Sequence, residues 1–150
     1  MGRGKTELTA KEYLGQLEGL DISIRQDLER LGEMKTDACC PGGTDYSRDR
    51  VQAPISGDKL GSQVTRYIAF NDYINMEIDR FSDAREQIIS EIRGLHEPHY
   101  MRLLFKVYVQ FKSLKVAADE MGMSYQYVRN LHKKALAEFE RAYPNLQYLT

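Results

Sequence analysis

The sequence contains no run of about eighteen apolar residues, the length that a helix needs to cross a membrane. Its first seven residues, Met-Gly-Arg-Gly-Lys-Thr-Glu, also lack the apolar core of a signal peptide. We therefore expect a protein that has no membrane-spanning segment and resides in the cytoplasm.

Cysteine is scarce, with only Cys39 and Cys40, which are adjacent in the chain. A disulfide between neighbouring residues would be strained, and a zinc site would need distant histidines because there is no second cysteine pair. His96 and His99 are three residues apart, but Pro98 lies between them and no cysteine or aspartate is near. We expect no metal site and no cofactor.

Catalytic motifs are also absent. The sequence has no glycine loop of the kind that binds phosphates and no recognisable nucleophile motif. Asp and Glu are plentiful, but on amphipathic helices such residues usually form solvated faces. We therefore expect no catalytic residues and no enzymatic activity.

Charge is plentiful, at 29% of the residues, and it is unevenly distributed. Residues 1–57 hold 8 basic and 10 acidic side chains, residues 58–97 hold 5 and 8, and residues 98–150 hold 8 and 4. The net charge of −1 thus conceals a carboxyl-terminal segment of charge +4. Such a segment suits a nucleic-acid backbone, although this modest charge predicts weak non-specific binding by one copy.

Amphipathic patterns predict an all-α fold. Thr9 and Glu12 have the spacing of a capping box, and a helix is expected from there to about Asp37. Its apolar stripe consists of Leu14, Leu17, Ile24, Leu28 and Leu31, widened by Leu20 and Ile22. Residues 1–57 are thus predicted to contain this helix and a long loop.

The loop starts at Cys39-Cys40-Pro41-Gly42-Gly43 and continues to about Gly57, which is longer than most loops in compact domains. Two interpretations remain open. The segment is a disordered linker, or some of its side chains fold over the carboxyl-terminal unit or contact a partner. The side chains in question are those of Ser47, Arg48, Arg50 and Gln52.

A single long helix is expected from about Asp58 to Leu95, within a segment 58–97. Residues spaced alternately three and four apart follow the pattern of a coiled-coil seam. They are Val64, Tyr67, Asn71, Ile74, Ile78, Phe81, Arg85, Ile88, Ile92 and Leu95. Such a seam must be covered by the first helix, the carboxyl-terminal helices or a second copy. We expect a long helical hairpin that also serves as the platform of a homodimer.

Residues 98–144 are expected to form a three-helix unit, with a tail over residues 145–150. Pro98 suits the first turn of a helix, and apolar residues between Tyr100 and Tyr108 supply its buried side. Phe139 would anchor the last helix, and Pro144 marks its end.

Within this unit, residues 113–134 have the pattern of a helix-turn-helix. Gly122 can adopt the left-handed conformation that ends the first helix, and Ser124 can cap the second. The buried stripes are expected at Ala117, Ala118 and Met121 before the turn, and at Met123, Val128, Leu131 and Ala135 after it.

The second helix leaves polar and aromatic side chains on its other face. Gln and Asn can bond an adenine edge, Arg a guanine edge, and Lys a phosphate, so this face suits the major groove of double-stranded DNA. His132 either contacts a phosphate or bonds a backbone group. The candidate DNA-binding residues are Lys112, Lys115, Ser124, Tyr125, Gln126, Tyr127, Arg129, Asn130, Lys133 and Lys134.

Residues 113–139 resemble the region-four helix-turn-helix of bacterial sigma factors, and the whole chain resembles small phage and prophage transcriptional regulators of the RinA/ArpU type. The specific part is the run His132-Lys133-Lys134-Ala135-Leu136-Ala137-Glu138-Phe139, which in that family extends the recognition helix. The other matching residues are Val116, Ala117, Met121, Gly122, Ser124, Val128, Arg129 and Leu131. The match is looser upstream to residue 58 and the Val51-Gln52 loop, and residues 1–50 match only as a generic helix.

The motif and the resemblance together predict a sequence-specific transcriptional regulator of phage or prophage type, with RNA polymerase as a candidate partner. One alternative is a DNA-packaging assembly protein like a terminase small subunit, in which the coiled segment builds a ring. Those subunits often carry the DNA-binding unit at the amino terminus, which favours the regulator here. Another alternative is a protein-interaction module whose helix-turn-helix no longer binds DNA.

Overall fold

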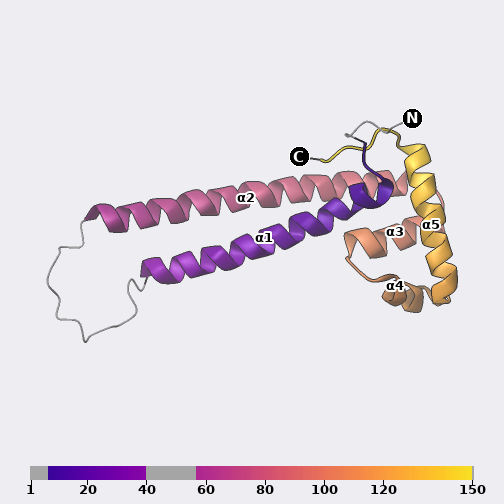
Figure 1. Ribbon diagram of the computed structural model, residues 1–150, viewed down its shortest axis with the longest axis horizontal. Coiled ribbons are helices and arrows are strands. Elements are labelled where there is room, and N and C mark those ends of the chain that lie inside the picture. Colours follow the sequence, from indigo (N-terminus) through magenta and orange to yellow (C-terminus); the bar gives the residue numbers. More distant parts are fainter. Residues whose placement is uncertain (1–6, 40–56, 150) are drawn as a thin grey trace. The chain divides into compact units, whose positions relative to one another are not determined.

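The computed structural model describes residues 7–39 and 57–149. Within these ranges every regular element is helical, which confirms the all-α fold (Figure 1). The elements are α1 (Ala10–Cys39), α2 (Gly57–Arg93), α3 (Pro98–Leu104), the π-helical turn η1 (Phe105–Val109), α4 (Leu114–Met121) and α5 (Tyr125–Ala142). None of the helices in the described ranges is both long enough and apolar enough to cross a membrane.

The long connection between α1 and α2 falls largely outside the described residues. The predicted roles of Ser47, Arg48, Arg50 and Gln52, and the similarity at Val51-Gln52, therefore stay predictions. The side chains of Cys39 and Cys40 also lie outside the described part of the chain, so the expectations about these cysteines stay predictions.

The chain divides into two compact units. The first consists of Met1–Asp21 and Arg80–Thr150, and the second of Ile22–Asp79. Each long helix contributes to both units, and all the shorter helices belong to the first. Segments from the two ends of the sequence therefore share one core in the first unit.

The predicted capping box at the start of α1 is present. The N–H of Glu12 donates to the Thr9 hydroxyl oxygen at 3.2 Å, and the N–H of Thr9 donates to the Glu12 carboxylate at 3.1 Å. A second carboxylate, that of Glu140 on α5, accepts from the N–H of Ala10 at 2.8 Å. The free N–H groups of this helix end are therefore bound partly by a helix 130 residues away in sequence.

The core of the first unit joins the start of α1, the end of α2 and α5. Leu14, Leu17 and Ile88 are fully buried there, as the apolar spacing predicted. Phe139 of α5 is also fully buried, and its ring centroid lies 5.8 Å from that of Tyr13. The anchoring role predicted for Phe139 is thus confirmed, and α5 is fixed to the two long helices.

The second unit covers its apolar residues less completely. The parts of α1 and α2 within it run antiparallel (Figure 1), and Ile24 and Ile74 are buried. However, Leu28, Val64 and Ile78 are 39–46% exposed, although the spacing predicted a covered stripe at these positions. The reason is geometric, since one helix packed against another covers only the centre of a wide apolar stripe.

The helix that precedes the helix-turn-helix is less regular than predicted. Pro98 occupies its first turn as expected, but after Leu104 the chain widens into the π-helical turn η1. The N–H of Gln110 then bonds to the carbonyl of Phe105 at 3.0 Å, and Phe111 follows with a positive φ of 58°. A π-turn contains more residues than an α-turn. Within this one, the neighbouring residues Tyr108 and Val109 are both buried.

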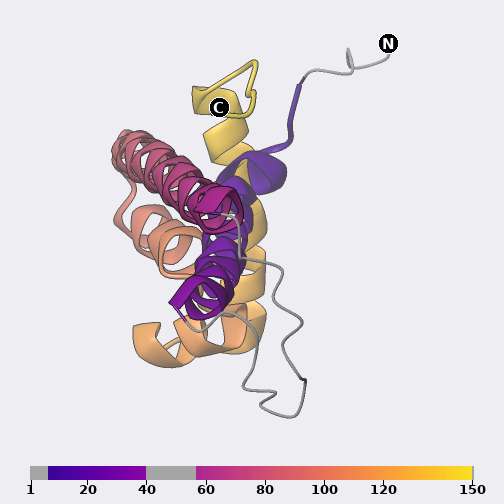
Figure 2. The ribbon, with the colours of Figure 1, turned by 90° about the vertical axis from the view of Figure 1, so that its left-hand side faces the viewer.

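The segment after α5, predicted as a tail, packs back on the first unit. α5 ends at Ala142, just before Pro144 as predicted, and Leu146 is buried. The carbonyl of Leu146 accepts from the N–H of Leu8 at 2.9 Å, so the two ends of the described chain meet. Figure 2 shows the segment after α5 turning back at the end of that helix.

Candidate nucleic-acid interface

The turn between α4 and α5 has the predicted left-handed glycine. Gly122 has φ 66° and ψ 32°, a conformation in which any side chain would be strained. The N–H of Met123 bonds to the carbonyl of Ala118 at 3.0 Å, and that of Gly122 to the carbonyl of Asp119 at 3.3 Å. This pair of bonds is a Schellman motif, which ends a helix and sets the direction of the next one.

Both helices of the motif carry a serine cap. The Ser124 hydroxyl accepts from the N–H of Tyr127 at 3.2 Å, which confirms the predicted cap of α5. The Ser113 hydroxyl accepts from the N–H of Val116 at 3.2 Å and caps α4 in the same way. The second cap was not predicted, although a serine directly before an apolar-periodic segment is the same sequence signal.

The two helices are held by a small apolar cluster of their own. Its fully buried or nearly buried members are Leu103 of α3, Ala117 and Ala118 of α4, and Val128 and Leu131 of α5. Met121 and Met123 pack against this cluster from the turn. The predicted stripes are confirmed, and Leu103 brings α3 into the same cluster.

The predicted DNA-binding residues of α5 all lie on its exposed face. At 100° per residue, Gln126, Asn130 and Lys133 lie opposite the buried stripe that contains Val128. The flanking exposed residues are Tyr125 and Arg129 on one side, and Tyr127 and Lys134 on the other. The capping residue Ser124 is exposed at the start of the same helix. The face of α5 opposite its buried stripe therefore presents amide side chains, and aromatic and basic side chains lie on both sides of them.

The two predicted lysines outside α5 differ in their surroundings. Lys115 is exposed on α4. Lys112, in contrast, donates to the Glu120 carboxylate at 2.7 Å, and Lys106 donates to the same group at 2.9 Å. Hydrogen bonds from both ammonium groups hold the pKa of Glu120 below its usual value. Lys106 was not predicted, because nothing in the sequence shows that three side chains 8 and 14 residues apart converge.

In the structure, His132 is bonded to a side chain and not to the predicted backbone group. Its Nε2 lies 2.8 Å from the hydroxyl of Tyr108, and the two rings stack with their centroids 5.7 Å apart. Burial lowers the pKa of His132, and the positive charge of Lys11 lowers it further. The lowered pKa disfavours the cationic form, and the contact with Tyr108 joins α5 to η1. A phosphate contact of His132 stays a prediction.

Metal binding has no evident site in this part of the chain. Among residues 7–39 and 57–149, no group of three or more His, Cys, Asp or Glu side chains could hold a metal ion. The chemistry that the exposed face offers is hydrogen bonding and positive charge.

The sequence of this chain is similar to that of a curated bacterial protein. Over 92 residues the chain is 29% identical to "RNA polymerase sigma factor SigO" of Bacillus subtilis (strain 168). The match covers 61% of this chain and 51% of that protein, so this chain spans about half the length of the relative. No protein-family model and no solved structure matches. Part of this chain is therefore similar in sequence to part of a bacterial sigma factor.

Proposed function

We propose that this protein is a sequence-specific DNA-binding transcriptional regulator that inserts α5 into the major groove. The observation that carries the proposal is the exposed face of α5. Gln126 and Asn130 lie on the side of α5 opposite its buried stripe, and the helix begins directly after a glycine turn with a serine cap. A buried stripe on the opposite side fixes this helix to α3 and α4. Helix-turn-helix proteins bind DNA with the first residues of such a helix.

Each exposed residue has a role that follows from its chemistry. Gln126 and Asn130 bond adenine edges, and Arg129 bonds a guanine edge. Lys115, Lys133 and Lys134 contact phosphates and position the helix without reading bases. No enzymatic step belongs to this function.

RNA polymerase is the second proposed partner. The support is the similarity to a protein whose name identifies it as an RNA polymerase sigma factor. The setting that we propose from the resemblance to RinA/ArpU-like regulators is phage or prophage transcription. In this proposal the protein binds promoter DNA through α5 and presents another surface to the polymerase.

A homodimer is proposed because one copy leaves apolar side chains exposed in the second unit. Val64, Ile68 and Ile78 of α2 and Leu28 of α1 are 39–53% exposed. A second copy could cover them, and two DNA-binding helices would offset the weak binding of one. Sedimentation should therefore give a dimer. A ring of about eight or more copies would instead support the DNA-packaging alternative.

Selection of binding sites from random duplex DNA, followed by fluorescence anisotropy, tests the central proposal. We expect one enriched sequence, and an affinity for it that drops when Gln126 and Asn130 are both replaced by alanine. Lys35→Ala, an exposed change in the second unit, is the control and should bind as the wild type does. Amide resonances from Ser124 to Lys134 that stay unmoved by the selected duplex at low salt would contradict the proposal.

A further inference from the structure

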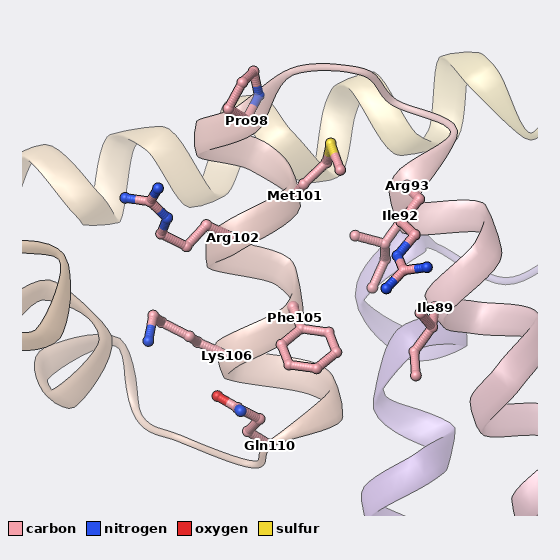
Figure 3. A pocket seen from close by; sticks show the side chains of 9 residues that line it. All are labelled: Ile89, Ile92, Arg93, Pro98, Met101, Arg102, Phe105, Lys106 and Gln110. Carbon is pink, nitrogen blue, oxygen red and sulfur yellow. The ribbon is translucent and has the colours of Figure 1, made fainter.

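A groove in the first unit lies apart from the exposed face of α5. It is formed by the end of α2 together with α3 and η1, and its volume is about 490 Å³. Figure 3 shows Ile89 and Ile92 of α2 facing Phe105 of η1 across this space, with Met101 of α3 above them. The middle of the groove is therefore apolar.

Positive charge borders the groove on both sides. Arg93 extends from the α2 side, and Arg102 extends from the α3 side (Figure 3). Both are exposed, and neither forms an ion pair with another described residue. Lys106 is a third cation at the border, although it is paired with Glu120. None of the nine lining residues is acidic.

We infer that this groove binds an amphipathic helix of a partner protein, with apolar side chains on the groove floor and carboxylates on both flanks of the helix. Apolar residues spaced three or four apart would cover Met101 and Phe105, which is how helices dock in grooves. Carboxylates on the flanks would pair with the guanidinium groups of Arg93 and Arg102, in the bidentate geometry that arginine favours. A DNA backbone would satisfy the arginines but would leave the apolar floor uncovered.

The test is a selection of helix-forming peptides from a random display library against the full-length protein. We expect enriched peptides to combine an apolar stripe with Asp or Glu on its flanks. Labelled copies should lose roughly tenfold or more in affinity for the double variant Arg93→Ala/Arg102→Ala, as measured by fluorescence anisotropy. Met101→Gln, which makes the floor polar, should also weaken binding. Lys115→Ala removes a basic residue elsewhere in the unit and should leave binding unchanged.

Several results would overturn the inference. They are a failure to enrich any peptide, enrichment of basic or purely polar peptides, and equal affinity for the wild type and the arginine double variant. Displacement of the bound peptide by duplex DNA would also overturn it, because the arginines would then belong to the DNA interface.

The inference can fail or hold independently of the proposed function. Peptide binding is measured without DNA, and the variant Gln126→Ala/Asn130→Ala should bind the peptide like the wild type. Loss of DNA binding in that variant with retained peptide binding would assign the two activities to two separate surfaces.

Discussion

Tyr108 and His132 form a hydrogen-bonded, stacked pair, with 2.8 Å between the phenolic oxygen and Nε2. Tyr108 lies in the π-helical turn η1 and His132 in α5, so the pair connects η1 to the helix that we propose binds DNA. Burial raises the pKa of Tyr108 to about 12 and lowers the pKa of His132. The bond therefore joins two neutral groups near neutral pH.

This pair predicts a decrease of stability in mild acid. The lowered pKa of His132 means that the unfolded chain binds the proton first when the pH falls below about 6.5. The free energy of unfolding should thus decrease as the pH falls from about 6.5 towards the pKa of the folded state, and recover as the pH rises. Thermal denaturation between pH 5 and 7, roughly the range in which histidine titrates, would measure this.

Removal of the imidazole provides the control for this prediction. His132→Gln should lose part of the pH dependence, whereas His99→Gln changes an exposed side chain and should retain it. An identical pH profile for His132→Gln and the wild type would show that other groups cause the acid effect.

Val128→Asp should unfold the helix-turn-helix. The Val128 side chain is fully buried in the cluster that joins α3, α4 and α5, so the substitution buries an unpaired carboxylate at a cost of about 3–5 kcal/mol. Circular dichroism during thermal denaturation would measure the loss. Val116→Asp is the matched control, because Val116 is 44% exposed on α4 and its replacement should change the free energy of unfolding by about 0.5 kcal/mol or less.

Gly122→Ala should destabilise the protein by about 1–2 kcal/mol, the cost of a left-handed backbone for a residue with a Cβ. An added Cβ meets nothing within 4 Å at this position, so the cost is conformational and not a clash. Gly122→Val should cost more because its side chain is β-branched, and Gly122→Asn should cost least. Gly19→Ala also meets open space but lies inside α1, where it should stabilise by roughly 0.5–1 kcal/mol. Equal effects at Gly19 and Gly122 in chemical denaturation would contradict the role of the turn.

The helix-turn-helix could be predicted from the sequence because its determinants are local. The left-handed turn at Gly122, the cap at Ser124 and the buried positions at Val128 and Leu131 all depend on residues a few positions apart. The lengths of α1 and α2 followed from apolar spacing in the same way, since periodicity depends on the helix alone.

Features that depend on contacts distant in sequence could not be predicted. The bond between Ala10 and Glu140, and the pair of Tyr108 and His132, need the folded arrangement of several helices. The π-helical turn has no sequence signal of its own. The exposure of Leu28 was also missed, because an apolar stripe shows which face can pack but not how much of it a partner covers.

Arg129→Ala should lower the affinity for the selected site by about 1–3 kcal/mol and relax the base preference at one position. The physical reason is the loss of a bidentate contact to a guanine edge. Arg141→Ala is the control, because Arg141 lies in the last turn of α5 and its guanidinium pairs with Glu138 at 2.7 Å. Anisotropy titrations on the selected and on scrambled duplexes would measure both variants. An equal loss on all duplexes would make Arg129 a phosphate contact.

Glu120→Gln should strengthen DNA binding, because its carboxylate holds the ammonium groups of Lys106 and Lys112 in the free protein. Release of Lys112 would add a phosphate contact, so the slope of log affinity against log salt concentration should steepen by about 0.9. Asp119→Asn changes the net charge equally at the neighbouring exposed position and is the matched control. If Asp119→Asn raises the affinity and the slope as much as Glu120→Gln does, net charge alone explains the effect. A larger effect of Glu120→Gln would show that Glu120 competes with DNA for Lys112.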